Sequence, residues 1–302
     1  MTDHVLVLIA PPGRGDALEA MVSALPRDAG VVWSPARWLA PGEAVEIAFF
    51  APEGPDGLGS LRARMTARRA DAAIDACIVP AAGRRKRLLV ADMDSTIIGQ
   101  ECIDEMADIL GLKPQIAAIT DRAMRGELAF EDALRARLAL LKGLAEADLE
   151  RVWLERIRLN PGARTLTATM RANGGRAVLV SGGFTYFTTR VAAAAGFDEH
   201  HANRLEVADG RLTGNVVGAI LGREAKLATL ERVCRDMGLG LDEALAIGDG
   251  ANDLAMIRAA GLGVAFRAKP IVAAEAHAGV EHGDLTALLY LQGYRREEFV
   301  GG

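Results

Sequence analysis

Four apolar residues at positions 88–91 are followed at once by Asp92, Met93 and Asp94. Such a run is typical of a buried strand, so the two acids should lie at the edge of a sheet. Because residues two apart on an extended chain point the same way, we expect Asp92 and Asp94 on one side and Met93 on the other. Like charges this close repel each other unless a cation lies between them or one is protonated, and both conditions suit phosphoryl transfer. The simpler alternative is a polar turn that only ends a strand.

The C-terminal half of the chain alternates between short apolar runs and segments with helical periodicity. We predict strands at 176–180, 244–247 and 262–266, helices at 163–172, 184–195, 224–237 and 253–260, and a hairpin that turns at Asp209 and Gly210. Strands that alternate with helices predict a Rossmann-like parallel sheet with helices on both faces, so the fold class is α/β. Ligands in such folds bind at the carboxyl ends of the strands.

Two further segments differ from this pattern. Residues 99–159 show helical spacing alone and predict a helical cap inserted behind the two acids. Residues 1–82 predict a separate βαββαβ domain, with strands at 5–10, 30–38, 44–51 and 73–80 and helices at 17–25 and 58–69. In element order this unit resembles the ferredoxin-like ACT domains, and it offers a packing surface for a homodimer. The basic run 83–87 predicts a solvated linker, which leaves 88–98 and 160–302 as the core.

Composition excludes several classes of protein. With a formal net charge of −5, the chain of 302 residues has no general attraction for nucleic acid or for an acidic membrane. No apolar run approaches the roughly 20 residues of a membrane helix, and residues 5–10 lack the flanks of a signal peptide, so we expect a cytoplasmic protein. The three cysteines fit neither a disulfide framework nor a zinc site, and we expect His200 and His201 in a surface loop.

Three more segments carry residue types that suit a phosphate and a metal. The apolar run 178–180 ends in Ser181 and two glycines, whose backbone N–H groups can approach an anion. A second run, 244–247, ends in a Gly-Asp-Gly-x-Asn-Asp motif that offers hard oxygen ligands to a cation. Lys226 lies in the predicted helix between them. Taken alone, Ser-Gly-Gly could be a plain turn and the lysine a solvated side chain, whereas the carboxylate motif is specific.

In chain order, Asp-x-Asp-Ser-Thr, Ser-Gly-Gly, the lysine and Gly-Asp-Gly-x-Asn-Asp resemble the haloacid dehalogenase superfamily of phosphohydrolases, over residues 88 to about 290. The local sequences at 99–105, 130–137, 180–184 and 202–205 are similar to those of its phosphoserine phosphatases. The resemblance implies a Mg²⁺-dependent enzyme that releases phosphate from the small molecule O-phospho-L-serine, the last step of serine biosynthesis. The N-terminal unit lies outside the resemblance, as in longer bacterial members with an added ACT-like domain.

The resemblance also implies roles for individual residues. Asp92 would be the nucleophile that forms an aspartyl phosphate, and Asp94 the general acid and base. Mg²⁺ would be bound by Asp92, the backbone carbonyl of Asp94 and Asp249, with Asp253 supporting its waters. The remaining phosphate oxygens would be bound by Ser181, the Gly182 amide and Lys226, while Asn252 would orient the lysine or the phosphate.

Substrate choice is expected to depend on the cap. Phosphoserine carries an ammonium and a carboxylate, so its site needs an anion and a cation a few ångströms apart. The resemblance assigns Glu101 to the amine and Arg137 to the carboxylate, with Met124 and Phe130 as walls that exclude water. An insertion of this kind can close over the strand ends as a lid.

Two other functions stay open at this point. A phosphatase or phosphotransferase of the same superfamily could act on another small phosphorylated metabolite, with homoserine as the alternative acceptor. A protein of a different class would be an amino-acid sensor, in which the N-terminal unit binds the ligand and the rest is a degenerate scaffold. Every catalytic position of the motif set is filled, which argues against the sensor.

Overall fold

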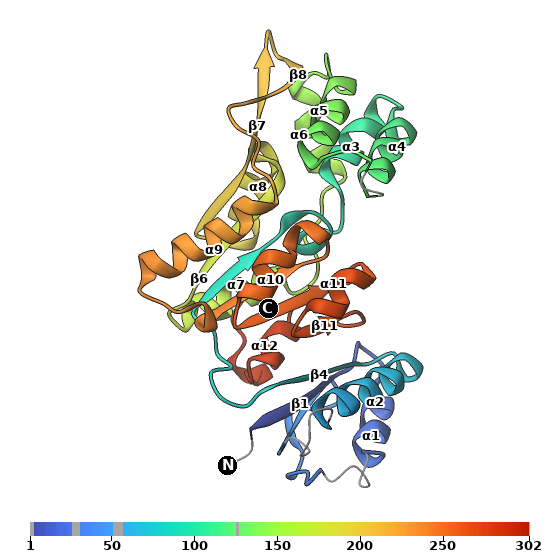
Figure 1. The fold of residues 1–302 in the computed structure, drawn as a ribbon, viewed down its shortest axis with the longest axis vertical. Helices are drawn as coiled ribbons and strands as arrows, with labels where there is room; N and C mark the ends of the chain where they lie inside the picture. Colours follow the sequence, from blue (N-terminus) through green and yellow to red (C-terminus); the bar gives the residue numbers. More distant parts are fainter. Residues whose placement is uncertain (1–2, 26–30, 51–56, 125–126, 302) are drawn as a thin grey trace.

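The computed structural model centres on a sheet of seven strands, which are β5 (Leu88–Ala91), β6 (Arg176–Phe184), β7 (Glu199–Ala208), β8 (Arg211–Val217), β9 (Ala244–Gly248), β10 (Leu262–Phe266) and β11 (Ala278–Val280). Their order is β11-β10-β9-β5-β6-β7-β8 (Figure 1). Neighbours are parallel except β7 and β8, which form an antiparallel hairpin. The structure describes residues 3–25, 31–50, 57–124 and 127–301, and the side chains of residues 69–71 and 124 lie outside this description.

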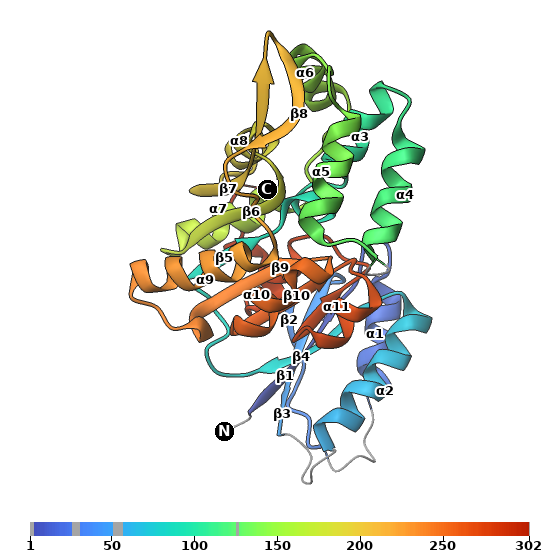
Figure 2. The same cartoon turned by 45° about the horizontal axis from the view of Figure 1, so that its top comes forward.

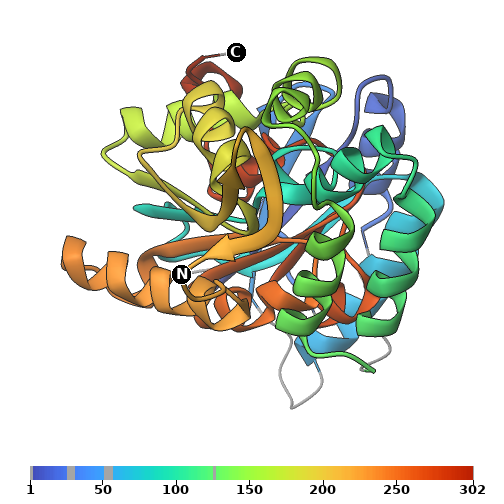
Figure 3. The ribbon, with the colours of Figure 1, turned by 90° about the horizontal axis from the view of Figure 1, so that it is seen from above.

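Alternate residues of the sheet face two different helix layers. Leu89 and Ala91 of β5 belong to one core cluster, and Leu88 and Val90 to another. Figure 3 shows helices on either side of the sheet, which confirms the predicted α/β architecture. Among the described residues, no helix combines the length and the apolarity that a membrane crossing requires. The first cluster includes residues of α7 (Ala163–Ala172), α8 (Thr185–Ala195) and α12 (Ala287–Leu291). The second includes residues of α9 (Arg223–Met237), α10 (Leu254–Ala259) and α11 (Pro270–Glu275). Two short 3₁₀ turns are η2 (Leu241–Glu243) and η4 (Arg296–Glu298).

The strand order of the sheet changes direction at β5. From there β6 and β7 follow on one side, whereas β9, β10 and β11 follow on the other. Binding sites in open α/β sheets form outside the carboxyl ends of the strands at such a point. The residues that follow β5, β6 and β9 therefore meet at one edge of the sheet.

In the described part of the segment between β5 and α7, four helices form a cap. Figure 2 shows this cap on one side of the strand ends. Buried apolar side chains at helical spacing, such as Met106, Leu134 and Leu138, explain why this segment folds as helices. Ile98 pairs with Leu159 where the chain leaves and re-enters the core. The cap helices are α3 (Cys102–Ile109), α4 (Lys113–Met124), α5 (Phe130–Leu140) and α6 (Glu146–Glu155).

The β7–β8 hairpin makes a second connection to the cap, beside α5 and α6 in Figure 1. The Gly143 N–H donates to the Leu212 carbonyl (2.8 Å), and the Leu212 N–H donates to the Leu144 carbonyl (2.9 Å). The cap is therefore held both where it leaves the core and at the hairpin.

The N-terminal unit has the predicted βαββαβ order, in a sheet arranged β2-β3-β1-β4. The strand that we predict at 30–38 is wrong for residues 31–36, because β2 begins only at Arg37 and Trp33 forms an isolated bridge to Phe49, while residue 30 lies outside the described residues. Pro35 lies between them and has no N–H to donate to a ladder. The elements are β1 (His4–Ile9), α1 (Gly15–Ser23), β2 (Arg37–Ala40), β3 (Ala44–Phe49), α2 (Gly57–Ala72) and β4 (Asp75–Pro80).

The basic run 83–87 is exposed at Gly83, Arg85 and Arg87, whereas Arg84 packs into the junction between the two units. Only 11% of the Arg84 side chain is exposed, and its guanidinium donates to Glu46 (2.7 Å) in one unit and to the Leu291 carbonyl (3.0 Å) in the other. The buried carboxylate of Asp75 also crosses the junction. The N-terminal unit is thus docked on the core, while the residue limits of the units stay a prediction. Asp75 accepts bonds from the backbone N–H groups of Glu281, His282 and Gly283.

Candidate active site

Asp92 directly follows β5 and caps the turn η1 (Met93–Ile97), which contains Asp94. Asp92 is 5% exposed, its N–H donates to the Ile247 carbonyl of β9 (3.0 Å), and its carboxylate accepts the Met93 N–H (2.8 Å). Met93 is fully buried in the core, in agreement with the expected alternation. The turn requires Ser95 at a φ of 54°, in the left-handed region.

Lys226 reaches two of the acids from α9. Its Nζ lies 2.7 Å from Asp92 Oδ1 and 2.5 Å from Asp253 Oδ1, and the residue is 1% exposed. Burial lowers the pKa of Lys226, but the charges of Asp253 and Asp92 raise it, and the net direction is upward. The lysine is therefore a buried cation, which excludes the alternative of a solvated side chain.

Asp249 completes an acidic cluster at this edge of the sheet. Carboxylate oxygens of Asp92, Asp249 and Asp253 lie within 4.8 Å of one another. Burial, and next the charge of Asp253, raise the pKa of Asp249 to about 6, and the same two causes raise the pKa of Asp92. Lys226 pairs with two of the three carboxylates, those of Asp92 and Asp253, so the ionised cluster carries more negative charge than this one ammonium offsets. Hard oxygen ligands with that charge fit a divalent cation.

Asp253 is fully buried and uses both of its carboxylate oxygens within the protein. Oδ1 accepts from Lys226, and Oδ2 accepts the Gly250 N–H (3.0 Å). Asn252, in the turn η3 (Ala251–Asp253), is half-buried. Among the contacts of the described residues none joins Asn252 to Lys226, so its orienting role stays a prediction, as does the supporting role of Asp253.

Asp94 lies apart from the cluster, where the cap begins. Burial, and next the charge of Glu101, raise the pKa of Asp94 to about 7. The Cys102 N–H donates to Oδ1 (3.1 Å), and the Ser181 hydroxyl donates to Oδ2 (3.4 Å). A carboxyl group with such a pKa can both give and take a proton near neutral pH. Sequence reasoning missed Cys102, whose backbone N–H can make this bond whatever the residue type, and whose buried thiol also interacts with Asp94.

A bulge in β6 carries the Ser-Gly-Gly motif. Residues 181–183 face a single residue of β7, Ala202, so the strand that we predict at 176–180 continues beyond its expected end. A bulge of this kind turns backbone out of the ladder toward a site. A Cβ added to Gly183 would lie 2.9 Å from Asp94 Oδ2, so glycine is needed for this close approach.

The cap brings Glu101 and Arg137 toward each other. Glu101 is exposed at the start of α3 and accepts the Ser95 hydroxyl (2.7 Å). Arg137 of α5 is half-buried, and its Nε donates to the Ala133 carbonyl (3.3 Å). Burial lowers the pKa of Arg137, while the charge of Glu101 is the largest influence that raises it. The expected anion and cation are therefore close enough to interact electrostatically.

Phe130, the first residue of α5, lies over the bulge of β6. A Cβ added to Gly182 would lie 3.1 Å from the Phe130 ring, which is tighter than an ordinary contact. The cap thus covers the glycine to which we assign a phosphate contact. The side chain of Met124, the other predicted wall, lies outside the described part of the chain.

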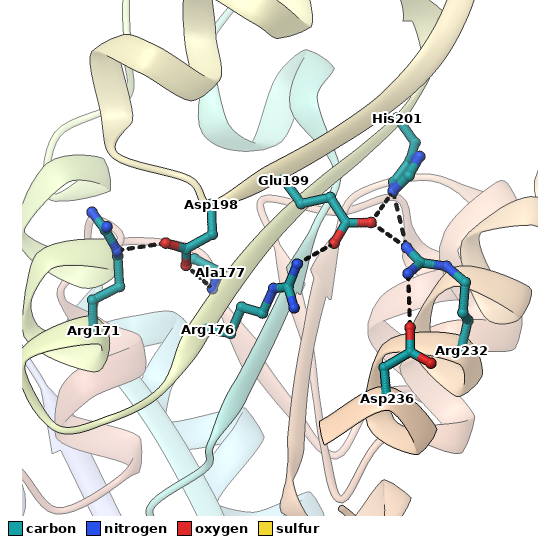
Figure 4. Close-up of polar contacts among 8 residues, drawn as sticks. All are labelled: Arg171, Arg176, Ala177, Asp198, Glu199, His201, Arg232 and Asp236. Atoms are coloured by element: carbon teal, nitrogen blue, oxygen red, sulfur yellow. Dashed lines mark hydrogen bonds and ion pairs between the residues drawn. The ribbon is translucent and has the colours of Figure 1, made fainter. Parts of the chain in front are cut away.

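His200 and His201 lie in β7 and are half-buried, so the prediction of a surface loop is wrong. His201 Nε2 lies 2.5 Å from Glu199 Oε1, and Glu199 also pairs with Arg176 and Arg232 (Figure 4). The sequence offers no strong periodicity here. Pairing of β7 with β6 decides the conformation instead.

Comparison with known protein families agrees with this geometry. A family model described as haloacid dehalogenase-like hydrolase matches residues 89–258. The matched segment begins in β5 and ends in α10, so it contains the acidic cluster, Lys226 and the bulge of β6.

Curated relatives are similar over most of this chain. A phosphoserine phosphatase from Streptomyces coelicolor is 46% identical over 240 residues, which are 79% of this chain and 58% of the relative. The chain therefore spans less than two thirds of that relative. A phosphoserine phosphatase from Albidiferax ferrireducens is 46% identical over 210 residues, which are 68% of this chain and 89% of the relative.

Solved structures show the same architecture. A haloacid dehalogenase family hydrolase from Salmonella enterica serovar Typhi has a TM-score of 0.82 at 30% identity, over 96% of this chain and 98% of that one. Its match includes the N-terminal unit. A structure described as a phospho-aspartyl intermediate analogue of phosphoserine phosphatase has a TM-score of 0.64 at 39% identity, over 68% of this chain and 98% of that one.

Proposed function

This chain belongs to the haloacid dehalogenase-like hydrolase family, and from that membership we propose that it is a phosphoserine phosphatase. It would hydrolyse O-phospho-L-serine to L-serine and phosphate with Mg²⁺, as the last step of serine biosynthesis. The names of the relatives support the substrate. The observation that carries the proposal is the convergence of Asp92, Lys226 and Asp253 at one sheet edge, from elements far apart in the sequence.

Asp92 is the proposed nucleophile of the first step. Its carboxylate attacks phosphorus, so that a bond to Asp92 forms while the bond from phosphorus to the serine oxygen breaks. Asp94 gives its proton to the departing oxygen, and a pKa of about 7 keeps that proton available near neutral pH. Lys226 offsets the negative charge that develops on the phosphoryl oxygens.

The second step uses the same residues in reverse. Asp94 is now ionised and takes a proton from water, whose oxygen attacks phosphorus. The bond from phosphorus to Asp92 breaks, which restores the carboxylate and releases phosphate. One site therefore serves both displacements.

Asp92, Asp249 and the backbone carbonyl of Asp94 are the proposed ligands of Mg²⁺. The uncompensated charge of the acidic cluster supports a divalent cation at this position. When bound, Mg²⁺ would offset charge on the phosphoryl oxygens and help to orient them. Asp253 is proposed to support the waters of the bound Mg²⁺, since one of its carboxylate oxygens lies within 4.8 Å of oxygens of Asp92 and Asp249.

Glu101 and Arg137 are the proposed recognition pair for the substrate's ammonium and carboxylate groups. Their mutual electrostatic influence supports this assignment, since the ammonium and the carboxylate of the substrate must both be bound within one small site. Phe130 would exclude water from the phosphate above the β6 bulge, with Met124 as a second wall.

We extend the proposal to location and assembly. The enzyme would act in the cytoplasm and form a homodimer through its N-terminal unit. In support, β2 is an edge strand of its sheet, and Trp38 on that strand is 37% exposed. Sedimentation velocity measures the assembly, and a monomer at every concentration tested would contradict it.

Phosphate release from a panel of phosphorylated amino acids and sugars, with and without Mg²⁺, tests the function. We expect O-phospho-L-serine to be preferred and Asp92→Asn to be inactive with an unchanged circular dichroism spectrum. Turnover by Asp92→Asn would contradict the nucleophile assignment. Phosphate transfer to added homoserine in excess of free phosphate would favour the phosphotransferase instead.

A further inference from the structure

Asn203 of β7 bridges two turns with its side-chain amide and is 3% exposed. Nδ2 donates to the Gly182 carbonyl (2.8 Å), and Oδ1 accepts the Leu221 N–H (2.7 Å). A carbonyl can only accept and an N–H can only donate, so a single orientation of the amide satisfies both partners. The amide therefore ties the two turns to each other at a fixed separation.

The two turns hold different sides of the proposed phosphate site. Gly182 follows Ser181 in the bulge of β6. Leu221 precedes Gly222, the residue that caps the N-terminus of α9, and α9 carries Lys226. A shift of either turn would move a proposed phosphate contact relative to the other.

A chain of hydrogen bonds leads from Asn203 to Asp94. The Gly182 carbonyl and the Gly183 N–H belong to one planar trans peptide, so they point in opposite directions. The Gly183 N–H donates to Ser181 Oγ (2.9 Å), and the Ser181 hydroxyl donates to Asp94 Oδ2 (3.4 Å). Every donor in the chain points toward Asp94, and hydrogen bonds in such a chain polarise one another.

The other residues on this side of β7 brace the strand. Glu199, His201 and Asn203 alternate along β7 and so face the same way. Glu199 pairs with Arg176 of β6 and with Arg232 of α9 (Figure 4). These ion pairs join β7 to both elements at one end of the strand, and Asn203 joins it to the turns of the same two elements nearer the site.

We propose that Asn203 is a positioning residue that holds the β6 bulge and the start of α9 in the arrangement needed for phosphoryl transfer. This inference rests on the proposed phosphatase function. Asn203 touches no reacting atom in it and acts through Ser181 on one side and through α9 on the other.

A double-mutant cycle with Ser181→Ala tests the route through the bulge. Asn203→Asp keeps an oxygen for the Leu221 N–H, but when ionised it cannot donate to Gly182. We expect this change to lower kcat by about tenfold and KM to move by less than about threefold, because phosphate contacts strengthen in the transition state. In the Ser181→Ala background the same change should lower kcat by less than about twofold, since the hydrogen-bond chain to Asp94 is already broken at Ser181.

A merely structural role would lower kcat by the same factor in both backgrounds, because partial unfolding acts regardless of Ser181. Equal losses, or no loss in either background, would therefore overturn the proposal. Asn215→Asp, at an exposed position of the same hairpin, is the matched control and should keep wild-type kcat.

Amide hydrogen exchange tests the clamp without any turnover. The Leu221 amide should stay protected in Asn203→Asp and exchange at least about tenfold faster in Asn203→Leu, which removes the acceptor. Unchanged exchange in Asn203→Leu would contradict the clamp. If the unaltered protein hydrolysed no phosphate ester, the proposed function would fail, and the exchange result would still decide whether Asn203 holds the two turns.

Discussion

Lys226 Nζ lies 2.7 Å from Asp92 Oδ1, and both side chains are buried. Taking two charges out of water is unfavourable unless they pair and meet further partners. Asp253 holds the same ammonium, so the pair belongs to a network of three residues. Lys226 is therefore the counter-ion of the acidic cluster as well as the proposed contact for phosphate.

Lys226→Met removes the ammonium that the acidic cluster shares. Because it leaves buried carboxylates without a counter-ion, the free energy of unfolding in EDTA should fall by about 3–5 kcal/mol. Phosphatase activity should become undetectable. Urea denaturation at neutral pH measures the stability, with Lys142→Met at an exposed cap position as the control. A variant as stable as the wild type would show that the network does not stabilise the fold.

Asp249 and Asp94 should each destabilise the metal-free protein as the pH rises from about 4 to about 7, because the fold raises the pKa of Asp249 from 3.8 to about 6 and that of Asp94 from 3.8 to about 7. In this window these two groups bind more protons in the folded state than in the unfolded chain. Their contribution to the free energy of unfolding therefore falls as those protons leave.

Urea midpoints in EDTA across this window, for the wild type and Asp249→Asn, isolate the contribution of one group. The decline should be shallower in Asp249→Asn, and saturating Mg²⁺ should flatten it in the wild type because the cation offsets the charge. A wild-type decline no steeper than that of Asp249→Asn would contradict the raised pKa of Asp249.

Arg137→Ala should reduce discrimination between O-phospho-L-serine and phosphoethanolamine, which lacks the carboxylate. A hydrogen bond to a charged group contributes about 1.5–3 kcal/mol, so the ratio of the two kcat/KM values should fall by at least about tenfold. Arg135→Ala, exposed on the same helix, should leave the ratio unchanged. Retained discrimination in Arg137→Ala would show that Arg137 does not bind the substrate's carboxylate.

Asp75→Ala should loosen the junction between the N-terminal unit and the core. The buried carboxylate accepts the N–H groups of Glu281, His282 and Gly283, and each donor left unpaired costs about 1–3 kcal/mol. We expect lower stability and faster proteolysis within 83–87. Asp121→Ala, at an exposed position, is the control. Equal proteolysis of the two variants would indicate that Asp75 does not hold the units together.

Residues at the strand ends could be predicted because their signals are local. The apolar run before Asp92 and the glycines around Asp249 each indicate a strand that stops, since burial and turn chemistry act within a few residues. Parallel packing then brings those ends to one edge of the sheet. The same reasoning predicts the βαββαβ order of the N-terminal unit, which the structure confirms.

Contacts between distant elements could not be predicted in this way. Arg84 has the local sequence of a solvated linker, yet only 11% of its side chain is exposed and it pairs with Glu46. His201 lies in a strand whose sequence gives little sign of it. The clamp made by Asn203 depends on how β6, β7 and α9 pack together. The amino-acid sequence alone was enough to place the acids at strand ends. The folded structure decided which residues form ion pairs and hydrogen bonds with them, because the distances between elements depend on packing across the whole sheet and no local sequence pattern specifies those distances.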